Sequence, residues 1–169
     1  MILLQGVRTQ PQAKPPRRAT TESACWDVYA CLVAGMKVQV NNEWNEHATR
    51  TVTDSQITLF GGERALIPTG WIFDIPLGHS VRLHPRSGLA WKQGVSLANS
   101  QGVIDSDYVE ETFVCLYNMT EVQHVIHHGD RLAQMEITPV CDFVFREHDQ
   151  TPAVKTDRQG GFGSTGIHT

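Results

Sequence analysis

The sequence predicts an all-β sandwich or barrel that forms a single domain with one short helix. Its 169 residues are enough to bury one core of their own. From residue 24 to about 145, the apolar residues come in short runs that Gly, Pro, Asn and Asp interrupt. Short strands at such spacing are typical of sandwiches and barrels.

The N-terminal part predicts a short first strand and then an extended connector. Residues 9–18 combine prolines with positive charge, which disfavours both a helix interior and a central strand. Residues 36–56 contain three asparagines and the alternating stretch Val38-Gln39-Val40. The alternation indicates an extra hairpin, and the sequence does not indicate its role.

Later strands are expected at the apolar runs 71–75, 80–83, 112–117, 124–126 and 137–140. A helix is expected near residues 86–92, with Ser87 as its cap and Gly94 at its end. The segment 157–166 is so rich in glycine that it orders only against something else.

Composition excludes several classes of protein. No apolar run approaches the roughly 18 residues that span a bilayer, and the start of the chain lacks the apolar stretch of a secretory signal. We therefore expect a cytoplasmic protein with no membrane partner. The net charge of −4 argues against binding of nucleic acid.

The cysteines and histidines show no metal-ligand spacing. The four cysteines form no C-x-x-C pair, and the eight histidines follow no ligand pattern. Neither a zinc site nor a disulfide framework is indicated, so the cysteines are expected to be reduced and mostly structural.

Three segments contain residues suited to a triphosphate: 86–88, 130–134 and the glycine-rich tail with Ser164 and Thr165. Glycines let backbone N–H groups approach anionic oxygens, and Arg and hydroxyl groups add charge-assisted hydrogen bonds. Taken alone, such segments are more typical of an ordinary helix cap or flexible tail.

Residues 102–108 predict a β-hairpin in which Asp105 and Ser106 form the turn and Tyr108 begins the return strand. A carboxylate at this turn can orient a water for attack on phosphorus, and Tyr108 can stack against a sugar. Alternatively, Asp105 and Asp107 only hydrogen-bond their own turn.

Five segments in one order resemble the five motifs of the trimeric dUTPase family: 20–28, 85–90, 102–108, 129–135 and 160–166. Three positions depart from that pattern. Cys25 stands where glycine is usual, Glu110 replaces the glycine two places after the tyrosine, and Arg158 lies one residue closer to the phenylalanine.

The resemblance implies a jelly-roll-like β domain over residues 1–156, with 36–56 as an insertion, and a glycine-rich lid arm over residues 157–169. It also implies a homotrimer with shared active sites. The implied reaction is Mg²⁺-dependent hydrolysis of dUTP to dUMP and pyrophosphate by attack of water on the α-phosphorus. This reaction keeps uracil out of DNA and supplies dUMP for thymidylate synthesis.

The same resemblance implies a role for each site residue. Asp105 activates the water, with Ser87 and Gln134 as its catalytic partners, and Asp27 contacts the outer water shell of Mg²⁺. The residues implied to bind substrate are Arg86, Ser87, Gly88, Asn99, Gly102, Val103, Ile104, Asp105, Tyr108, Gln134, Arg158, Phe162, Gly163, Ser164 and Thr165.

Among these residues, Asn99 and the backbone of residues 102–104 pair with uracil, and Tyr108 excludes a 2′-hydroxyl. Phe162 stacks on the base as a lid. Ser164, Thr165 and Arg158 close over the γ-phosphate.

Two other interpretations stay open. One is a dCTP deaminase, which resembles this pattern but carries a catalytic glutamate where Cys115 stands here. The other is a binding or signalling module with reduced catalysis, in which residues 36–56 contact a protein partner.

Overall fold

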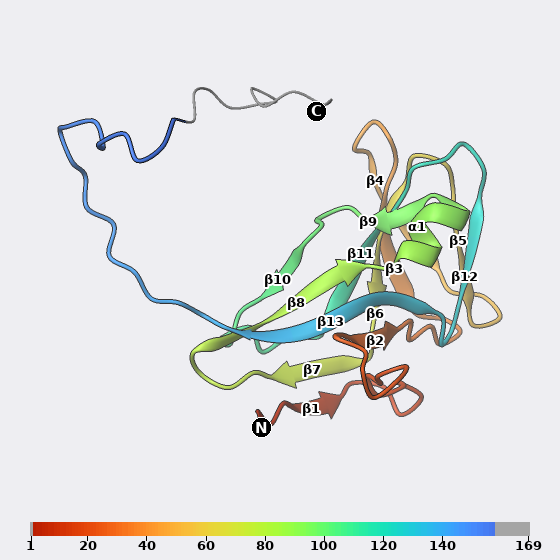
Figure 1. Cartoon of the computed structure of the whole chain (residues 1–169). Helices are drawn as coiled ribbons and strands as arrows, with labels where there is room; N and C mark the ends of the chain where they lie inside the picture. The colour runs from red at the N-terminus through yellow and green to blue at the C-terminus, as the bar shows by residue number, and fades with distance from the viewer. Residues whose placement is uncertain (1, 158–169) are drawn as a thin grey trace.

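The prediction of an all-β fold with one short helix is confirmed by the computed structural model, which describes residues 2–157 (Figure 1). The elements in chain order are β1 Gln5–Arg8, β2 Trp26–Tyr29, β3 Lys37–Asn41, β4 His47–Thr51, β5 Gln56–Leu59, β6 Arg64–Pro68, β7 Trp71–Asp74, β8 His79–Pro85, α1 Ser87–Gln93, β9 Val95–Leu97, β10 Gly102–Ile104, β11 Phe113–Asn118, β12 His124–His127 and β13 Arg131–Pro139.

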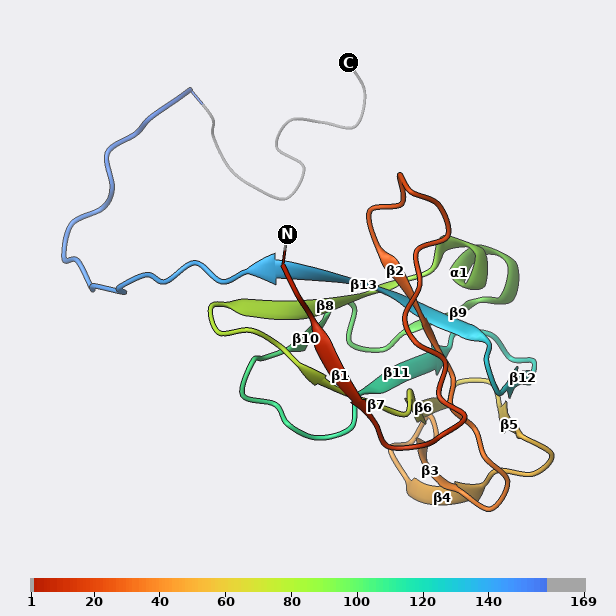
Figure 2. The ribbon, with the colours of Figure 1, turned by 90° about the horizontal axis from the view of Figure 1, so that it is seen from below.

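Two larger antiparallel sheets enclose the core. One has the strand order β10-β8-β13-β2, and the other has the order β4-β3-β6-β11-β9. Two-stranded ribbons, β1-β7 and β12-β5, complete the body (Figures 1 and 2). A single apolar cluster contains Val81 and Met135 of the first sheet together with Ile67 and Leu116 of the second. The core therefore lies between the two sheets, as in a sandwich.

The first sheet has one apolar and one polar face. Val81 and Leu83 of β8 and Met135 of β13 are buried in the core. Successive side chains of a strand point to opposite faces, so His84 and Gln134 lie on the outer face. This alternation gathers polar side chains from three neighbouring strands on one surface.

The helix forms where expected, but its cap differs from the prediction. Arg86 is the N-cap, with extended backbone angles and no capping hydrogen bond from its side chain, and Ser87 is the first helical residue. Gly94 ends the helix in the left-handed conformation, with φ of 62°, as predicted. The prediction of Ser87 as the cap was wrong because β8 continues up to Pro85 and leaves Arg86 as the junction.

The predicted hairpin at residues 102–108 was also wrong. The strand β10 pairs with β8, with Val103 opposite Arg82, and Tyr108 begins no return strand. The chain instead crosses to β11, which pairs with β6 and β9 in the other sheet. Residues 105–112 therefore form a loop that connects the two sheets.

The hairpin predicted within residues 36–56 is confirmed, since β3 and β4 pair antiparallel from Lys37–Thr51 to Asn41–His47. Its first strand belongs to the core sheet, because β3 also pairs with β6 and buries Val38 and Val40. That residues 36–56 are an insertion and contact a partner stays a prediction.

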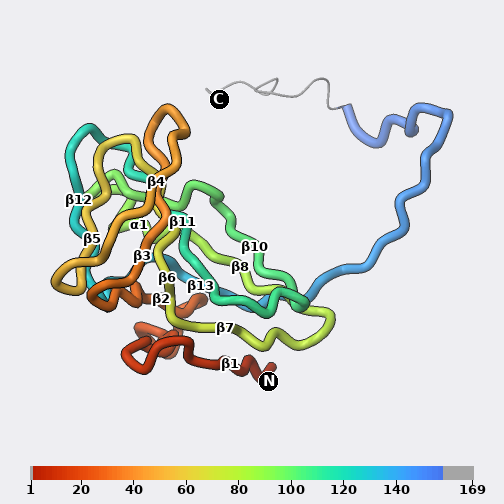
Figure 3. Tube along the Cα trace, turned by 180° about the vertical axis from the view of Figure 1, so that it is seen from behind, coloured from red at the N-terminus to blue at the C-terminus, as the bar shows by residue number. Residues whose placement is uncertain are grey.

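Residues 140–157 follow β13 and are exposed along their whole length (Figure 3). Their exposed large apolar side chains include Phe143, Val144 and Phe145, which are 84%, 90% and 83% exposed. The residues predicted to form a lid, Arg158, Phe162, Gly163, Ser164 and Thr165, lie outside the described residues. Within residues 2–157, no helix has the length and apolar character needed to cross a membrane.

Candidate active site

A buried carboxylate held by two arginines forms the first part of the site. Asp27 of β2 is 5% exposed. Arg131 Nη1 donates a hydrogen bond to its Oδ2 over 3.2 Å, and Arg86 Nε lies 3.2 Å from its Oδ1. Arg86 Nη1 also donates to the carbonyl oxygen of Arg131 over 3.1 Å. We call Asp27, Arg86 and Arg131 the arginine cluster.

The pair between Arg86 and Asp27 is an ion pair without a hydrogen bond. Among the described residues, neither Arg86 Nε nor Asp27 Oδ1 has a hydrogen-bond partner, although both atoms are buried. A buried polar atom without a partner costs free energy. The cluster therefore retains capacity to bind a ligand or a water.

Three more predicted residues lie beside the arginine cluster in the fold. Gln134 of β13 is paired in register with Asp27 on one side and with His84 on the other. Ser87 and Gly88 begin α1 directly after Arg86. A side chain added at Gly88 would meet no atom within 4 Å, so the space next to this backbone is open to a ligand.

The second part of the site is a cavity of about 280 Å³ that residues from both sheets line. Its size is close to the lower limit of ligand pockets, about 300 Å³. It brings together the residues within 2–157 that were predicted to contact base and sugar. The lining residues are Leu66, Leu83, Asn99, Gly102, Val103, Ile104, Asp105, Tyr108, Thr112 and Phe113.

The lining combines one exposed carboxylate with fixed polar groups. Asp105 directly follows β10 and is exposed, so its carboxylate can reach a water. Its carbonyl oxygen accepts a hydrogen bond from the amide of Tyr108 over 3.2 Å. The Tyr108 hydroxyl donates to the carbonyl oxygen of Glu111 over 3.0 Å, which holds the ring at the wall of the cavity.

The loop after Asp105 is anchored to the body through the Glu111 carboxylate. The hydroxyl of Thr9 donates to Glu111 Oε2 over 2.9 Å, and the amide of Gly70 donates to Oε1 over 2.8 Å. Because Glu111 also supplies the carbonyl that binds Tyr108, these contacts position the cavity wall.

The two parts of the site do not share residues: none of Asp27, Arg86, Ser87 and Gln134 lines the cavity. Sequence reasoning did not assign Arg131 a role, although it lies inside the fourth motif. It also missed Leu66 and Phe113, whose strands belong to the other sheet. No local pattern marks those two residues, because they reach the cavity through the packing of the sheets.

The two substituted glycine positions are compatible with L-residues. In the described part of the chain, the non-glycine residues with positive φ are Asn45, Asp54 and Ser55, so Cys25 and Glu110 adopt ordinary backbone angles. Burial raises the pKa of the Cys25 thiol, and the charge of Glu136 raises it further.

Cys115 lies in β11 at the position where the deaminase interpretation requires a glutamate. Burial raises the pKa of its thiol, and the opposing charge of Arg64 does not offset this. A neutral thiol at this place cannot act as a carboxylate in proton transfer.

Known proteins resemble this chain in sequence along most of its length. The family model described as dUTPase matches residues 51–166. The chain belongs to the dUTPase family. It is 50% identical over 115 residues to the deoxyuridine 5′-triphosphate nucleotidohydrolase of Rhizobium etli (strain CIAT 652), covering 68% of this chain and 72% of the relative.

A second relative covers more of the chain. The deoxyuridine 5′-triphosphate nucleotidohydrolase of Wolbachia pipientis subsp. Culex pipiens (strain wPip) is 40% identical over 152 residues, which are 89% of this chain and 86% of that protein. The chain is therefore a dUTP diphosphatase of nucleotide metabolism, and the prediction of dUTP hydrolysis is confirmed.

Solved structures of dUTPases share the fold. The Staphylococcus bacteriophage 80alpha dUTPase G164S mutant with dUpNHpp superposes with a TM-score of 0.76 at 19% identity, covering 99% of this chain and 100% of that chain. The dUTPase of Streptococcus mutans gives a TM-score of 0.64 at 23% identity, covering 84% and 98%.

Proposed function

We propose that Asp105 orients and activates the water that attacks the α-phosphorus of dUTP, so that dUMP and pyrophosphate are released. The observation that carries this proposal is the cavity, where an exposed carboxylate lies beside Asn99, the β10 backbone and Tyr108. Hydrolysis of a phosphoanhydride requires an oriented water and an acceptor for its proton.

The cavity would select the uracil deoxyribonucleotide. The backbone of Gly102, Val103 and Ile104 and the amide of Asn99 offer donors and acceptors to the edge of the base. A side chain at Gly102 would lie 3.2 Å from Leu83 Cβ and 3.5 Å from Asn99 Nδ2. Glycine therefore leaves Asn99 free to contact the ligand. The ring of Tyr108, held by Glu111, would lie under the deoxyribose and exclude a 2′-hydroxyl.

The arginine cluster would bind the phosphates together with Ser87, Gly88 and Gln134. Guanidinium groups form charge-assisted hydrogen bonds with phosphate oxygens. Asp27 keeps Arg86 and Arg131 close together in the absence of substrate. Ser87 would contact the oxygen that leaves with pyrophosphate, where negative charge develops.

Magnesium fits this site as an ion carried by the triphosphate. Mg²⁺ prefers oxygen ligands and keeps several of its waters. Asp27 Oδ1 receives no hydrogen bond among the described residues, so it suits a water in the outer shell of the ion. When bound, the ion would neutralise charge on the phosphate oxygens.

A homotrimer would complete the site. The cavity and the arginine cluster share no lining residue, so a second copy of the chain can supply one part. Phe143, Val144 and Phe145 are exposed large apolar residues of the kind that pack against a partner. The proposed arm, residues 157–169, would then reach a neighbouring site and place Arg158, Phe162, Gly163, Ser164 and Thr165 over the substrate.

The test is release of pyrophosphate from dUTP, dCTP, dTTP and UTP with Mg²⁺, for the native chain, Asp105→Asn and the control Asp107→Asn. We expect activity with dUTP alone, and a loss of at least about 1,000-fold in kcat for Asp105→Asn. Asp107 lies outside the cavity lining, so its variant should retain most activity. Equal losses in the two variants would contradict the role of Asp105.

A further inference from the structure

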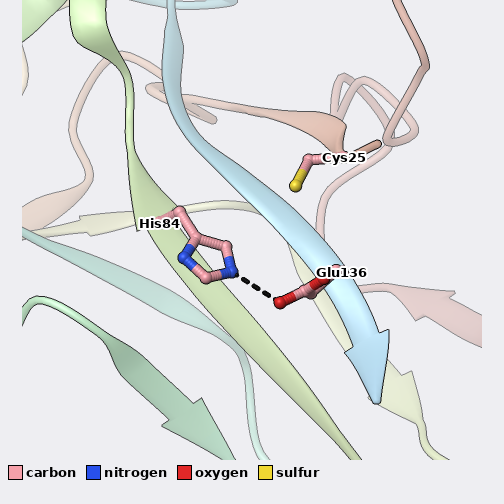
Figure 4. A group of neighbouring side chains, drawn as sticks. All are labelled: Cys25, His84 and Glu136. Carbon is pink, nitrogen blue, oxygen red and sulfur yellow. Dashed lines mark hydrogen bonds and ion pairs between the residues drawn. The ribbon is translucent and has the colours of Figure 1, made fainter. Parts of the chain in front are cut away.

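The outer face of the first sheet carries a second group of polar side chains beside the arginine cluster. Cys25 precedes β2, His84 lies in β8 and Glu136 lies in β13. Their potential ligand atoms, the Cys25 Sγ, a ring nitrogen of His84 and a carboxylate oxygen of Glu136, all lie within 4.8 Å of one another (Figure 4). Each of the three side chains is partly buried.

The register of the sheet explains why these residues meet. Cys25 and Asp27, His84 and Arg86, and Glu136 and Gln134 are each two positions apart in sequence. Side chains two positions apart in extended chain share one face, and Arg86 still has extended backbone angles. The group therefore forms a second row on the face that holds the phosphate-binding residues.

We propose that Cys25, His84 and Glu136 form a binding site for a divalent transition-metal ion of the Zn²⁺ type. Thiolate, imidazole and carboxylate are the ligands that Zn²⁺ takes in proteins, with three of them leaving a fourth position for water or substrate. The soft thiolate and the imidazole distinguish this site from one for Mg²⁺, which prefers oxygen ligands.

The spacing of the three groups suits an ion after small movements of the side chains. His84 Nε2 and Glu136 Oε1 are 2.9 Å apart and hydrogen-bonded. In a tetrahedral zinc site, ligand atoms are separated by about 3.3–3.8 Å, as bond lengths of roughly 2.0–2.3 Å require. The histidine and the glutamate would separate slightly, and the thiol, which lies within 4.8 Å of both, would approach by at most about 1 Å. The thiol proton would leave to solvent as the sulfur–metal bond forms.

A neighbouring amide can orient the histidine. Gln101 Nε2 lies 3.4 Å from both ring nitrogens of His84. A histidine that binds a metal through one nitrogen needs an acceptor for the N–H on the other. If the side-chain amide of Gln101 rotates by half a turn, its oxygen takes the place of Nε2. This oxygen would then accept the hydrogen bond from the N–H at His84 Nδ1.

The test uses the full, reduced, metal-free chain and Co²⁺ as a spectroscopic probe, with no nucleotide present. We expect one Co²⁺ per chain, a thiolate-to-cobalt charge-transfer band, the visible bands of tetrahedral cobalt, and displacement of the cobalt by Zn²⁺. Cys25→Ser should abolish the charge-transfer band, and Glu136→Gln should weaken binding at least about tenfold. Cys141→Ser is the matched control, because Cys141 is exposed and outside the group.

Absence of the charge-transfer band in the native chain would overturn the proposal, and this result needs no variant to fold. Retention of the band in Cys25→Ser, or its loss in Cys141→Ser, would overturn it as well. Because the readout requires no dUTP, failure of this proposal is distinct from failure of the proposed roles in dUTP hydrolysis.

Discussion

An ion pair between Arg50 of β4 and Glu63 adds a charged contact between the β3–β4 hairpin and the core, and we expect its removal to destabilise the fold. The Glu63 carboxylate accepts hydrogen bonds from Arg50 Nη1, from Arg50 Nη2 and from the amide of Phe60, each over 2.8 Å. The side chains of Arg50 and Glu63 are 26% and 10% exposed. Glu63→Gln keeps the size of this side chain and removes its charge.

The expected loss follows from these three contacts. A hydrogen bond to a charged group contributes about 1.5–3 kcal/mol and a neutral one about 0.5–1.5 kcal/mol, so the bond from the Phe60 amide, which becomes neutral, weakens by about 1 kcal/mol. The amide nitrogen of the substituted side chain cannot accept from Arg50, which removes one bond entirely. The partial exposure of Arg50 reduces the effect. We expect the free energy of unfolding to fall by about 2–3 kcal/mol.

The pH dependence gives the result a second signature. Burial raises the pKa of Glu63, but the hydrogen bonds from Arg50 and Phe60 and the charge of Arg50 outweigh it, so the pKa lies below its ordinary value of 4.5. The ionised carboxylate therefore stabilises the fold fully above pH 4.5, and this stabilisation is lost as the pH falls through the lower, folded-state pKa. The difference between the native chain and Glu63→Gln should shrink over that range.

The assay is urea unfolding at one fixed protein concentration from pH 3 to pH 7, because association would make stability depend on concentration. Glu46→Gln serves as the control, since Glu46 is an exposed carboxylate in the same hairpin. It should change the free energy of unfolding by less than about 0.5 kcal/mol. A loss for Glu63→Gln that is equally small, or that does not vary with pH, would refute the reasoning.

Four further changes test the site and its supports. Asp27→Asn should raise KM for dUTP by about tenfold, or 1.4 kcal/mol, because the two arginines then lack their shared anion; an unchanged KM in steady-state assays would contradict this. Gly94→Ala should reduce the free energy of unfolding by about 2–3 kcal/mol, since its new Cβ would combine a positive φ with a 2.2 Å approach to Thr120 Cγ2. Gly78→Ala, with a positive φ but no atom within 4 Å, should cost only about 1–2 kcal/mol in the same measurement. Ending the chain after Asp157 should leave the circular dichroism spectrum and the number of chains per assembly, measured by native mass spectrometry, unchanged and remove most turnover; full activity would exclude the proposed lid.

Part of the site could be predicted because it is continuous in sequence. Gly102 to Asp105 and Tyr108 all line the cavity, and a short loop keeps such residues close whatever the remainder of the chain does. The strand pairing of this segment was predicted wrongly, because residues 102–108 form no hairpin. The local sequence does not reveal that β10 pairs with β8. The partner of a strand is the distant strand that the fold of the whole chain places beside it.

The sequence by itself determined the class of fold, the end of the helix at Gly94 and the motifs that identify a dUTPase. These features depend on local periodicity and on backbone conformations that single residues allow. Only the tertiary structure decided that Arg131 binds Asp27, 104 positions away in sequence, and that Cys25, His84 and Glu136 meet on one face. The physical reason is that the pleat sets the face of each side chain locally, whereas the partners of a strand are set by packing of the whole chain.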